Sequence, residues 1–248
     1  SYVLTLDEMK KSYEYVSWPK LITITMVANA NSIIDTTVFK SNMETLRLKI
    51  ANTESEGFTW KIRDTKFYNQ ITMSCTCSHS TKSVKIFSNG SIQVAGCTDL
   101  FDCRRVIHQI VKILKRVMDI DVSIDTFRIC MINANFQFNR YVNLRKCVNH
   151  FGKHTMFKVA FSEDKYAAVK IKFKPADDMK QITASIFNTG KIIISGAQNL
   201  KEIAFGYNII IKYIELNNEV MEEENDNKQF DEILGFKIND LVKTLKDK

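Results

Sequence analysis

Two stretches of eleven residues share one pattern: IFSNGSIQVAG at residues 86–96 and IFNTGKIIISG at residues 186–196. Ile, Phe, Gly, Ile and Gly recur in the same places, 100 residues apart. In each stretch a strand ends at the Phe, a turn contains the first Gly, and a second strand follows, which is the pattern of a β-hairpin. The repetition predicts that the chain contains two copies of one structural unit.

The segments around the hairpins repeat as well. After each hairpin, apolar residues recur at helical spacing, over residues 101–117 and again over residues 203–214. Before each hairpin, VANAN at residues 27–31 resembles MINAN at residues 131–135, with an offset of 104. Each copy is thus predicted to form a strand, a short helix, a run of antiparallel strands and a long helix.

We therefore expect an α+β fold, a single domain of two pseudo-symmetric halves with helices covering one face of an antiparallel sheet. The expected parts are an N-terminal extension at residues 1–19, repeats at residues 20–120 and 121–216, and an acidic linker with a helical tail at residues 217–248.

Composition and charge limit the class of protein. Of the 248 residues, 45% are hydrophobic and 25% charged, with 8 Gly and 2 Pro, which excludes a disordered or collagen-like chain. The pattern shows neither a membrane span nor a signal peptide, so we expect an intracellular protein that does not bind a membrane. Residues 216–248 hold nine Asp or Glu against five Lys, a net charge of −4. Because the whole chain has a net charge of +7, residues 1–215 have a net charge of +11. A basic body favours a polyanionic partner.

The C-terminal tail has two parts. It opens with an acidic cluster that indicates a solvated linker, made of Glu219, Glu222, Glu223, Glu224 and Asp226. The apolar residues that follow have three- and four-residue spacings, which predict one or two amphipathic helices: Phe230, Ile233, Leu234, Phe236, Ile238, Leu241, Val242 and Leu245. Such a helix could dock on its own domain or bind a partner, and the spacing leaves both open.

The six cysteines allow two interpretations. Cys75, Cys77 and His79 form a Cys-x-Cys-x-His run, but zinc sites space paired cysteines two to four residues apart and need a second pair. In a strand, Cys75 and Cys77 lie on one face, where buried cysteine behaves as a small apolar residue. We expect core cysteines, with no metal, no cofactor and no disulfide framework.

The predicted sheet has a face that the helices leave uncovered. Its side chains are small, apolar or amide groups, which suits a ligand surface better than either core or bulk solvent. The candidates are Val27, Asn29, Asn31, Ala95, Met131, Asn133, Asn135, Ile193 and Ser195. The asparagines have a second interpretation, because the same residue type is common at turns and strand ends.

These residues resemble the TATA-box-binding protein family. The doubled hairpin is similar to the family's two Phe-x-x-Gly hairpins, and YAAVKIKFKP at residues 166–175 is similar to its strand that begins Phe-Ala-Ala-Val. The resemblance covers roughly residues 20–215, and MINANFQFN at residues 131–139 looks like the divergent members of large DNA viruses. It implies a saddle: a curved antiparallel sheet whose underside grips the DNA minor groove, with helices on the convex face.

The resemblance also assigns wedge residues. Minor-groove proteins of this family, a standard example of the mechanism, insert apolar side chains between base steps and kink the duplex. Phe87 and Phe187 match one wedge in each repeat, although both could be core residues of their hairpins. The other wedges match Tyr166 and, with Phe67 as the fallback, Tyr68. A tyrosine wedge would cost more to desolvate between bases.

Further contacts follow from the same resemblance. Amide donors can read the acceptors of A·T pairs in the minor groove, which supports Asn29, Asn31, Asn133 and Asn135. Lys172 and Lys191 match phosphate-contacting cations, where the first repeat has Ser74 and Ser91, so the second repeat is expected to contact DNA more extensively.

The first long helix is expected to carry a second surface. Its basic residues lie opposite the apolar stripe and match the family's contacts to partner proteins, or else form a solvated face: Arg104, Arg105, His108, Lys112, Lys115 and Arg116.

No nucleophile, base and acid constellation and no phosphate loop occurs, so we expect no enzymatic activity. The resemblance implies a monomeric transcription initiation factor that binds and bends A·T-rich double-stranded DNA and recruits general transcription factors or a viral RNA polymerase. Its expected location is the host cytoplasm, in viral factories, or the virion. The alternative is a protein-interaction scaffold that retains the fold but binds DNA weakly or not at all.

Overall fold

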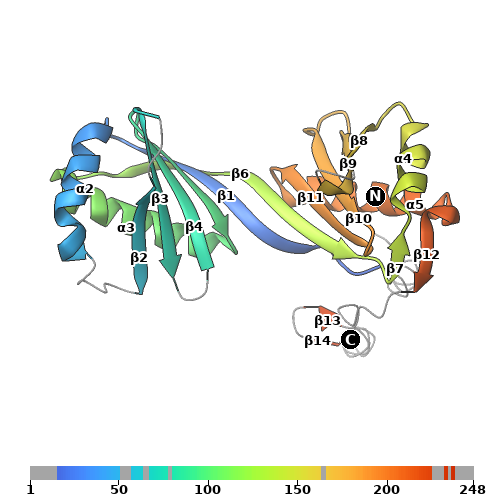
Figure 1. The fold of residues 1–248 in the computed structure, drawn as a ribbon. Coiled ribbons are helices and arrows are strands. Elements are labelled where there is room, and N and C mark those ends of the chain that lie inside the picture. The colour runs from blue at the N-terminus through green and yellow to red at the C-terminus, as the bar shows by residue number, and fades with distance from the viewer. Residues whose placement is uncertain are drawn as a thin grey trace, which may run out of the picture. The chain divides into compact units, whose positions relative to one another are not determined.

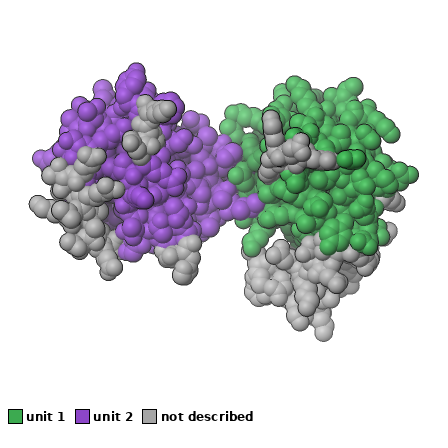
Figure 2. Space-filling model, in the orientation of Figure 1, with its two compact units in different colours: residues 1–21, 133–248 green, residues 22–132 purple. Residues whose placement is uncertain are grey.

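The computed structural model of the chain describes residues 16–50, 57–63, 67–77, 80–162, 166–224, 232–233 and 236–237. Contacts divide the chain into two compact units, coloured separately in Figure 2. Unit 2 consists of residues 22–132, and unit 1 of residues 1–21 and 133–248. Each unit is an antiparallel sheet with helices packed against one face.

In unit 2 the hydrogen-bonded strand order is β2-β3-β4-β5-β1. The strands are β1 (Lys20–Ala30), β2 (Phe58–Arg63), β3 (Gln70–Cys77), β4 (Ser80–Phe87) and β5 (Ser91–Cys97). The helices are α2 (Thr36–Ile50) and α3 (Leu100–Met118), which contact β3 and β5 respectively.

Unit 1 repeats this order: written in the same direction, its strands are β8-β9-β10-β11-β6. Its strands are β6 (Ile124–Gln137), which begins in unit 2, β8 (Lys158–Ser162), β9 (Tyr166–Phe173), β10 (Ile182–Phe187) and β11 (Lys191–Ala197). The helices are α4 (Leu144–Gly152) and α5 (Leu200–Glu215), labelled in Figure 1, and a short strand β7 (Arg140–Val142) precedes α4. The predicted antiparallel runs are thus present in both halves, and β2 and β8 are strands that the sequence pattern did not predict.

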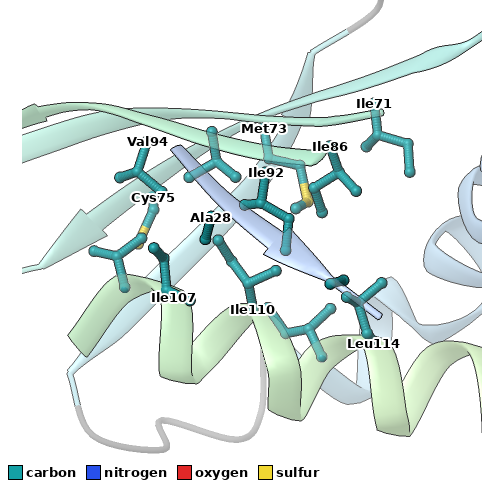
Figure 3. Close-up of a cluster of buried hydrophobic side chains, with 14 of the residues drawn as sticks. Ala28, Ile71, Met73, Cys75, Ile86, Ile92, Val94, Ile107, Ile110 and Leu114 are labelled. Atoms are coloured by element: carbon teal, nitrogen blue, oxygen red, sulfur yellow. The ribbon is translucent and has the colours of Figure 1, made fainter. Parts of the chain in front are cut away.

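The core of unit 2 lies between the sheet and α3. Figure 3 shows Ile92 and Val94 from β5 facing Ile107 and Ile110 from the helix. All four side chains are at most 2% exposed. The alternation along β5 explains this arrangement, since every second side chain points to the same face of a strand.

Both long helices begin with the same cap. The side-chain oxygen of Asp99 accepts a hydrogen bond from the Asp102 N–H at 2.8 Å, and that of Asn199 accepts one from the Glu202 N–H at 2.8 Å. An Asx residue at this position satisfies an N–H that the first helical turn leaves without a partner. The predicted helix starts after Thr98 and at Asn199 are therefore correct to within two residues.

Matching hydrogen bonds define which residues of the two repeats are equivalent. The Ala30 N–H donates to the Gly90 carbonyl at 2.9 Å, and the Phe138 N–H donates to the Gly190 carbonyl at 2.9 Å. The two glycines are 100 residues apart, but Ala30 and Phe138 are 108 apart. The expected offset of 104 between VANAN and MINAN is therefore wrong, because chance similarity in a short alternating segment outweighed the true alignment. Asn133 is equivalent to Thr25, not to Asn29.

The C-terminal segment differs from the expected linker and helix. A 3-10 turn, η1 (Asn218–Val220), leads into β12 (Met221–Glu224), which pairs antiparallel with β7. Beyond it, the described residues form two short paired strands, β13 (Glu232–Ile233) and β14 (Phe236–Lys237), in place of a helix. The remaining residues of the predicted tail helix, and most of the N-terminal extension, lie outside the described residues. None of the described helices is long and apolar enough to cross a membrane.

Candidate nucleic-acid interface

The face of the unit 2 sheet that points away from the helices is polar. Strand pairing aligns Val27 with Gln93, Gln93 with Lys85, and Lys85 with Thr72. A neighbouring row contains Thr25, Ala95, Ser83, Ser74 and Lys61. Because core side chains occupy the alternate positions, these residues share the opposite face.

The corresponding face of unit 1 has the same cross-strand rows but different side chains. Pairing aligns Ile193 with Ser185 and Ser185 with Lys170, and the next row aligns Ser195 with Thr183 and Thr183 with Lys172. Asn133 and Asn135 of β6 are half-buried and flank buried Ala134, and Met131 continues the same alternation on the part of β6 that belongs to unit 2. We call the two surfaces the open faces of units 2 and 1.

Most of the predicted contact residues lie on these open faces. Val27, Ala95, Met131, Asn133, Asn135, Ile193 and Ser195 are half-buried, and Asn29, Lys172 and Lys191 are exposed. Half-burial in a strand leaves side-chain atoms accessible to a ligand that lies on the sheet. The strand register thus groups by geometry the residues that the sequence placed on an uncovered sheet face, together with Lys172 and Lys191, which the resemblance added.

Asn31 is an exception. Strand β1 ends at Ala30, so Asn31 does not belong to the sheet. Its side-chain oxygen accepts a hydrogen bond from the Ser123 N–H at 3.0 Å, and its own N–H donates to the Ser123 carbonyl at 3.1 Å. This bond supports the strand-end interpretation of Asn31, while the base contact, which would use the amide NH2, stays a prediction.

The wedge candidates occupy equivalent positions. Phe87 is the last residue of β4 and pairs with Gln70, and Phe187 is the last residue of β10 and pairs with Ala168. Both phenylalanines are half-buried, and neither belongs to the core. They lie next to Gly90 and Gly190, whose positive φ angles of +83° and +82° close the two hairpin turns.

The tyrosine candidates follow from the same register. Because Gln70 is equivalent to Ala168, Tyr68 is equivalent to Tyr166. Tyr68 is 86% exposed, and the fallback Phe67 is 63% exposed. Tyr166 is the first residue of β9, but its side chain lies outside the described atoms.

Several cations on the open faces were missed by sequence reasoning. Unit 2 adds Lys61 and Arg63 from β2 and Lys85 from β4, and unit 1 adds Lys158 from β8 and Lys170 from β9. Strands β2 and β8 were not predicted, so the alternation that places Lys61, Arg63 and Lys158 on these faces could not be used. Lys85 and Lys170 lie on strands that were predicted and were overlooked there. The open face of unit 2 thus contributes Lys61, Arg63 and Lys85, and that of unit 1 contributes Lys158, Lys170, Lys172 and Lys191. Both repeats carry cations there, and the more extensive DNA contact expected of the second repeat stays a prediction.

Helix α3 exposes the predicted basic row. Arg104, Arg105, His108, Lys112, Lys115 and Arg116 are all exposed, while Val106, Ile107 and Ile110 on the other side are buried. Local contacts of this row include the Arg105 guanidinium, 5.3 Å from the Phe58 ring centre, and Lys115, which pairs with Asp121. That ion pair raises the pKa of Lys115. The row thus forms a charged helix face.

Four cysteines of unit 2, Cys75, Cys77, Cys97 and Cys103, belong to its interior, and Cys130 is half-buried. Cys75 and Cys77 are at most 6% exposed and alternate with exposed or polar residues of β3, as the core interpretation predicts. Burial raises the pKa of the Cys75 thiol to about 12, so the thiol is protonated at neutral pH. The described residues hold no cluster of three metal-ligating side chains, and His79 lies outside them.

A buried ammonium lies beside these cysteines. The Lys82 Nζ is 2.9 Å from the Cys77 Sγ and 2.6 Å from the Ser80 Oγ, and it forms an ion pair with Asp102. Burial lowers the pKa of Lys82, but the hydrogen bonds to Cys77 and Asp102 outweigh it and raise that pKa. This network stabilises the junction of β3, β4 and α3 and lies on the core side, away from the open face.

Comparison with known proteins identifies the architecture. Residues 126–216 match the family model described as "Transcription factor TFIID (or TATA-binding protein, TBP)". A protein named TATA-box-binding protein-like, from Acanthamoeba polyphaga mimivirus, is 28% identical over 79% of this chain. The chain therefore resembles the TATA-binding proteins, over its second repeat in the family model and over most of its length in the viral relative.

A solved structure supports the fold. The TBP of Methanococcus jannaschii superimposes with a TM-score of 0.54 at 15% identity, over 80% of this TBP-like chain and 98% of the archaeal one. The predicted class, an α+β fold of the TBP type, is therefore confirmed, as is the resemblance to a viral TBP-like protein. The aligned region spans 64% of the length of the mimivirus protein.

Proposed function

We propose that this TBP-like protein is a transcription initiation factor that binds A·T-rich double-stranded DNA through the minor groove and bends it. The observation that carries the proposal is the composition of the open faces. In both units they combine hydroxyl and cationic side chains, with amides on β1, β5 and β6 and a half-buried phenylalanine where the hairpin turns.

Each class of side chain has a distinct role in such a complex. The cations Lys61, Arg63 and Lys85 of unit 2, and Lys158 and Lys172 of unit 1, neutralise phosphates and give affinity without sequence preference. The amides of Asn133 and Asn135 donate to the acceptors that A·T pairs present in the minor groove. Readout of this kind separates A·T from G·C and little more.

The wedges account for bending. Phe87 and Phe187 insert between base steps, and the cost of unstacking, a few kcal/mol per step, is offset by the larger contact that bent DNA makes with protein. Steps that unstack easily are favoured, so sequence preference arises partly from deformability. The exposed Tyr68 is the second wedge on the unit 2 side.

The basic face of α3 supplies the recruitment function. Its six exposed basic residues form a row on the helix side of unit 2, opposite the open face, so an acidic surface of a transcription factor or polymerase can bind there while DNA occupies the other side. Reversing two charges, Arg104→Glu with Lys112→Glu, should abolish partner binding and leave DNA affinity within about twofold.

The direct test of DNA binding compares two duplexes of equal length, one A·T-rich and one G·C-rich, by fluorescence anisotropy at fixed salt. We expect the A·T-rich duplex to bind at least about tenfold more tightly, and a small molecule that fills the minor groove to compete. Equal affinity for both duplexes would show that the protein does not read sequence. Failure to bind either duplex would favour the scaffold alternative.

A further inference from the structure

The two units differ at one equivalent place, the segment that leads into the short helix. In unit 1 this segment is β7, residues 140–142, and in unit 2 it is residues 32–34. The equivalence rests on matched contacts: the Ile34 N–H donates to the Ser88 carbonyl at 2.9 Å, and the Val142 N–H donates to the Asn188 carbonyl at 2.8 Å. Helices α2 and α4 then begin at equivalent residues.

In unit 1 an added strand covers this segment. Strand β12 pairs with β7 and places Met221 opposite Val142. The Asn143 N–H donates to the Val220 carbonyl at 2.9 Å, and its carboxamide donates to the Glu222 carboxylate at 2.8 Å. Val142 and Val220 are both at most 2% exposed. Figure 1 shows β12 alongside β7.

In unit 2 no strand among the described residues takes the place of β12. Residues 32–34 have no strand assignment, and Ile33 is 84% exposed, compared with 36% for the equivalent Tyr141. Val38, in the first turn of α2, is 44% exposed. Two large apolar side chains therefore flank a backbone segment whose counterpart is paired.

The backbone of this segment is oriented to accept a strand. Successive N–H groups in an extended segment point to opposite edges, and Ile34 directs its own toward Ser88. The N–H groups of Ile33 and Asp35 consequently face the other edge, as does that of Asn143, which donates to Val220 in unit 1. An incoming segment would meet donors in the same places that β12 meets them.

The charge of Asp35 determines which kind of strand could pair with this segment. Asp35 is equivalent to Asn143, since its Oδ1 accepts from the Val38 N–H at 3.0 Å just as the Asn143 side chain accepts from Lys146 at 3.0 Å. A strand with the sequence of β12 would bring the Glu222 carboxylate against the Asp35 carboxylate. The site therefore disfavours the β12 of a second copy and favours a basic residue at that place.

We propose that residues 32–38 form a strand-addition site for an extended segment of a partner protein. The segment carries an apolar residue in the place of Val220 and, two positions later, a lysine or arginine that faces Asp35. Main-chain hydrogen bonds supply affinity in strand addition, and the side chains supply specificity. This site lies at the start of α2 and does not depend on DNA binding.

Two synthetic peptides test the proposal. One has the sequence of residues 217–224, NNEVMEEE, and the other has lysine in place of Glu222. Each is titrated into the isotope-labelled full chain while backbone amide resonances are followed by NMR. We expect the lysine peptide to shift resonances of residues 32–38 and to bind about five times more tightly than the glutamate peptide.

Two variants sharpen the result. Asp35→Asn keeps the helix cap and reproduces the chemistry of Asn143, so the preference for the lysine peptide should disappear. Ile33→Pro removes the N–H that faces the occupant, so binding should be lost while resonances outside the segment stay in place.

Three outcomes overturn the proposal. One is the absence of shifts at residues 32–38 with millimolar lysine peptide, and another is tighter binding of the glutamate peptide by the unaltered chain. The third is movement of these resonances when residues 225–248 are deleted, which would show that the chain's own tail fills the site.

Discussion

The Nζ of Lys82 lies 3.0 Å from the Oδ1 of Asp102, and Lys82 is 1% exposed. Removing one member of a buried ion pair leaves the other charge without compensation, which costs about 3–5 kcal/mol. We therefore predict that Lys82→Met lowers the free energy of unfolding, measured with urea, by that amount. The double variant Lys82→Met, Asp102→Asn should regain at least half of the loss, because Asn can still accept from the Thr98 N–H.

Lys85 provides the comparison for this experiment. It lies on the same strand but on the open face, so Lys85→Met should change the free energy of unfolding by no more than about 0.5 kcal/mol. If both single variants are equally stable, the buried pair does not stabilise unit 2.

The hairpin glycines are predicted to resist substitution. A Cβ at Gly90 would lie 2.8 Å from the Ala30 carbonyl oxygen, and one at Gly190 would lie 2.8 Å from that of Phe138. Both glycines have positive φ, which adds strain for any other residue. Gly90→Ala and Gly190→Ala should each lower the free energy of unfolding by at least about 2 kcal/mol. Gly152→Ala, with nothing within 4 Å of its Cβ, should be close to neutral.

These glycines also show how far sequence analysis reached. The doubled hairpin predicted the repeat, the two long helices and the placement of Phe87 and Phe187, because turn chemistry and apolar periodicity are local properties. Sequence analysis failed where the structure depends on pairing between residues far apart in the chain. The offset of 108 depends on which carbonyl the Ala30 N–H reaches, and the cations of β2 and β8 became visible only once those edge strands were placed.

The C-terminal segment was misjudged for a similar reason. The sequence MEEE is acidic and has little strand propensity, which favours a solvated linker. Pairing with β7 and burial of Val220 outweigh that preference. Local composition could identify neither the strand that pairs with residues 221–224 nor the side chains that bury Val220.

Buried thiols predict a loss of stability at high pH. Burial raises the pKa of both Cys75 and Cys147 from 9.0 to about 12. A hydrogen bond with Cys103, together with burial, also raises that of Cys97. A raised acid pKa stabilises the fold below the unfolded value and loses that contribution as pH rises, here between about pH 9 and 12.

Urea unfolding at a series of pH values measures this effect. The free energy of unfolding should fall as pH rises from 9 to 10.5, with a slope of up to about 1.4 kcal/mol per pH unit for each thiol. Cys147→Val should reduce the slope by about the contribution of one proton. A free energy that stays constant over this range would contradict the assignment of these thiols as buried and protonated.

Cations of both units are expected to contact phosphates. Lys61→Gln in unit 2 and Lys172→Gln in unit 1 should each weaken DNA binding similarly for all sequences and reduce the slope of log affinity against log salt by about 1. Lys112→Gln, on the exposed face of α3, should leave the slope unchanged. An effect confined to Lys172 would instead support the expectation that the second repeat contacts DNA more extensively.

The bend angle of an A·T-rich duplex, measured by energy transfer between dyes at its two ends, tests the central claim most directly. The unaltered chain should bring the dyes closer together, and Phe87→Ala with Phe187→Ala should abolish most of that change at saturating protein. Phe101→Ala removes a phenylalanine that is 77% exposed on α3 and should leave the bend intact. An unchanged bend in the double variant would contradict the account.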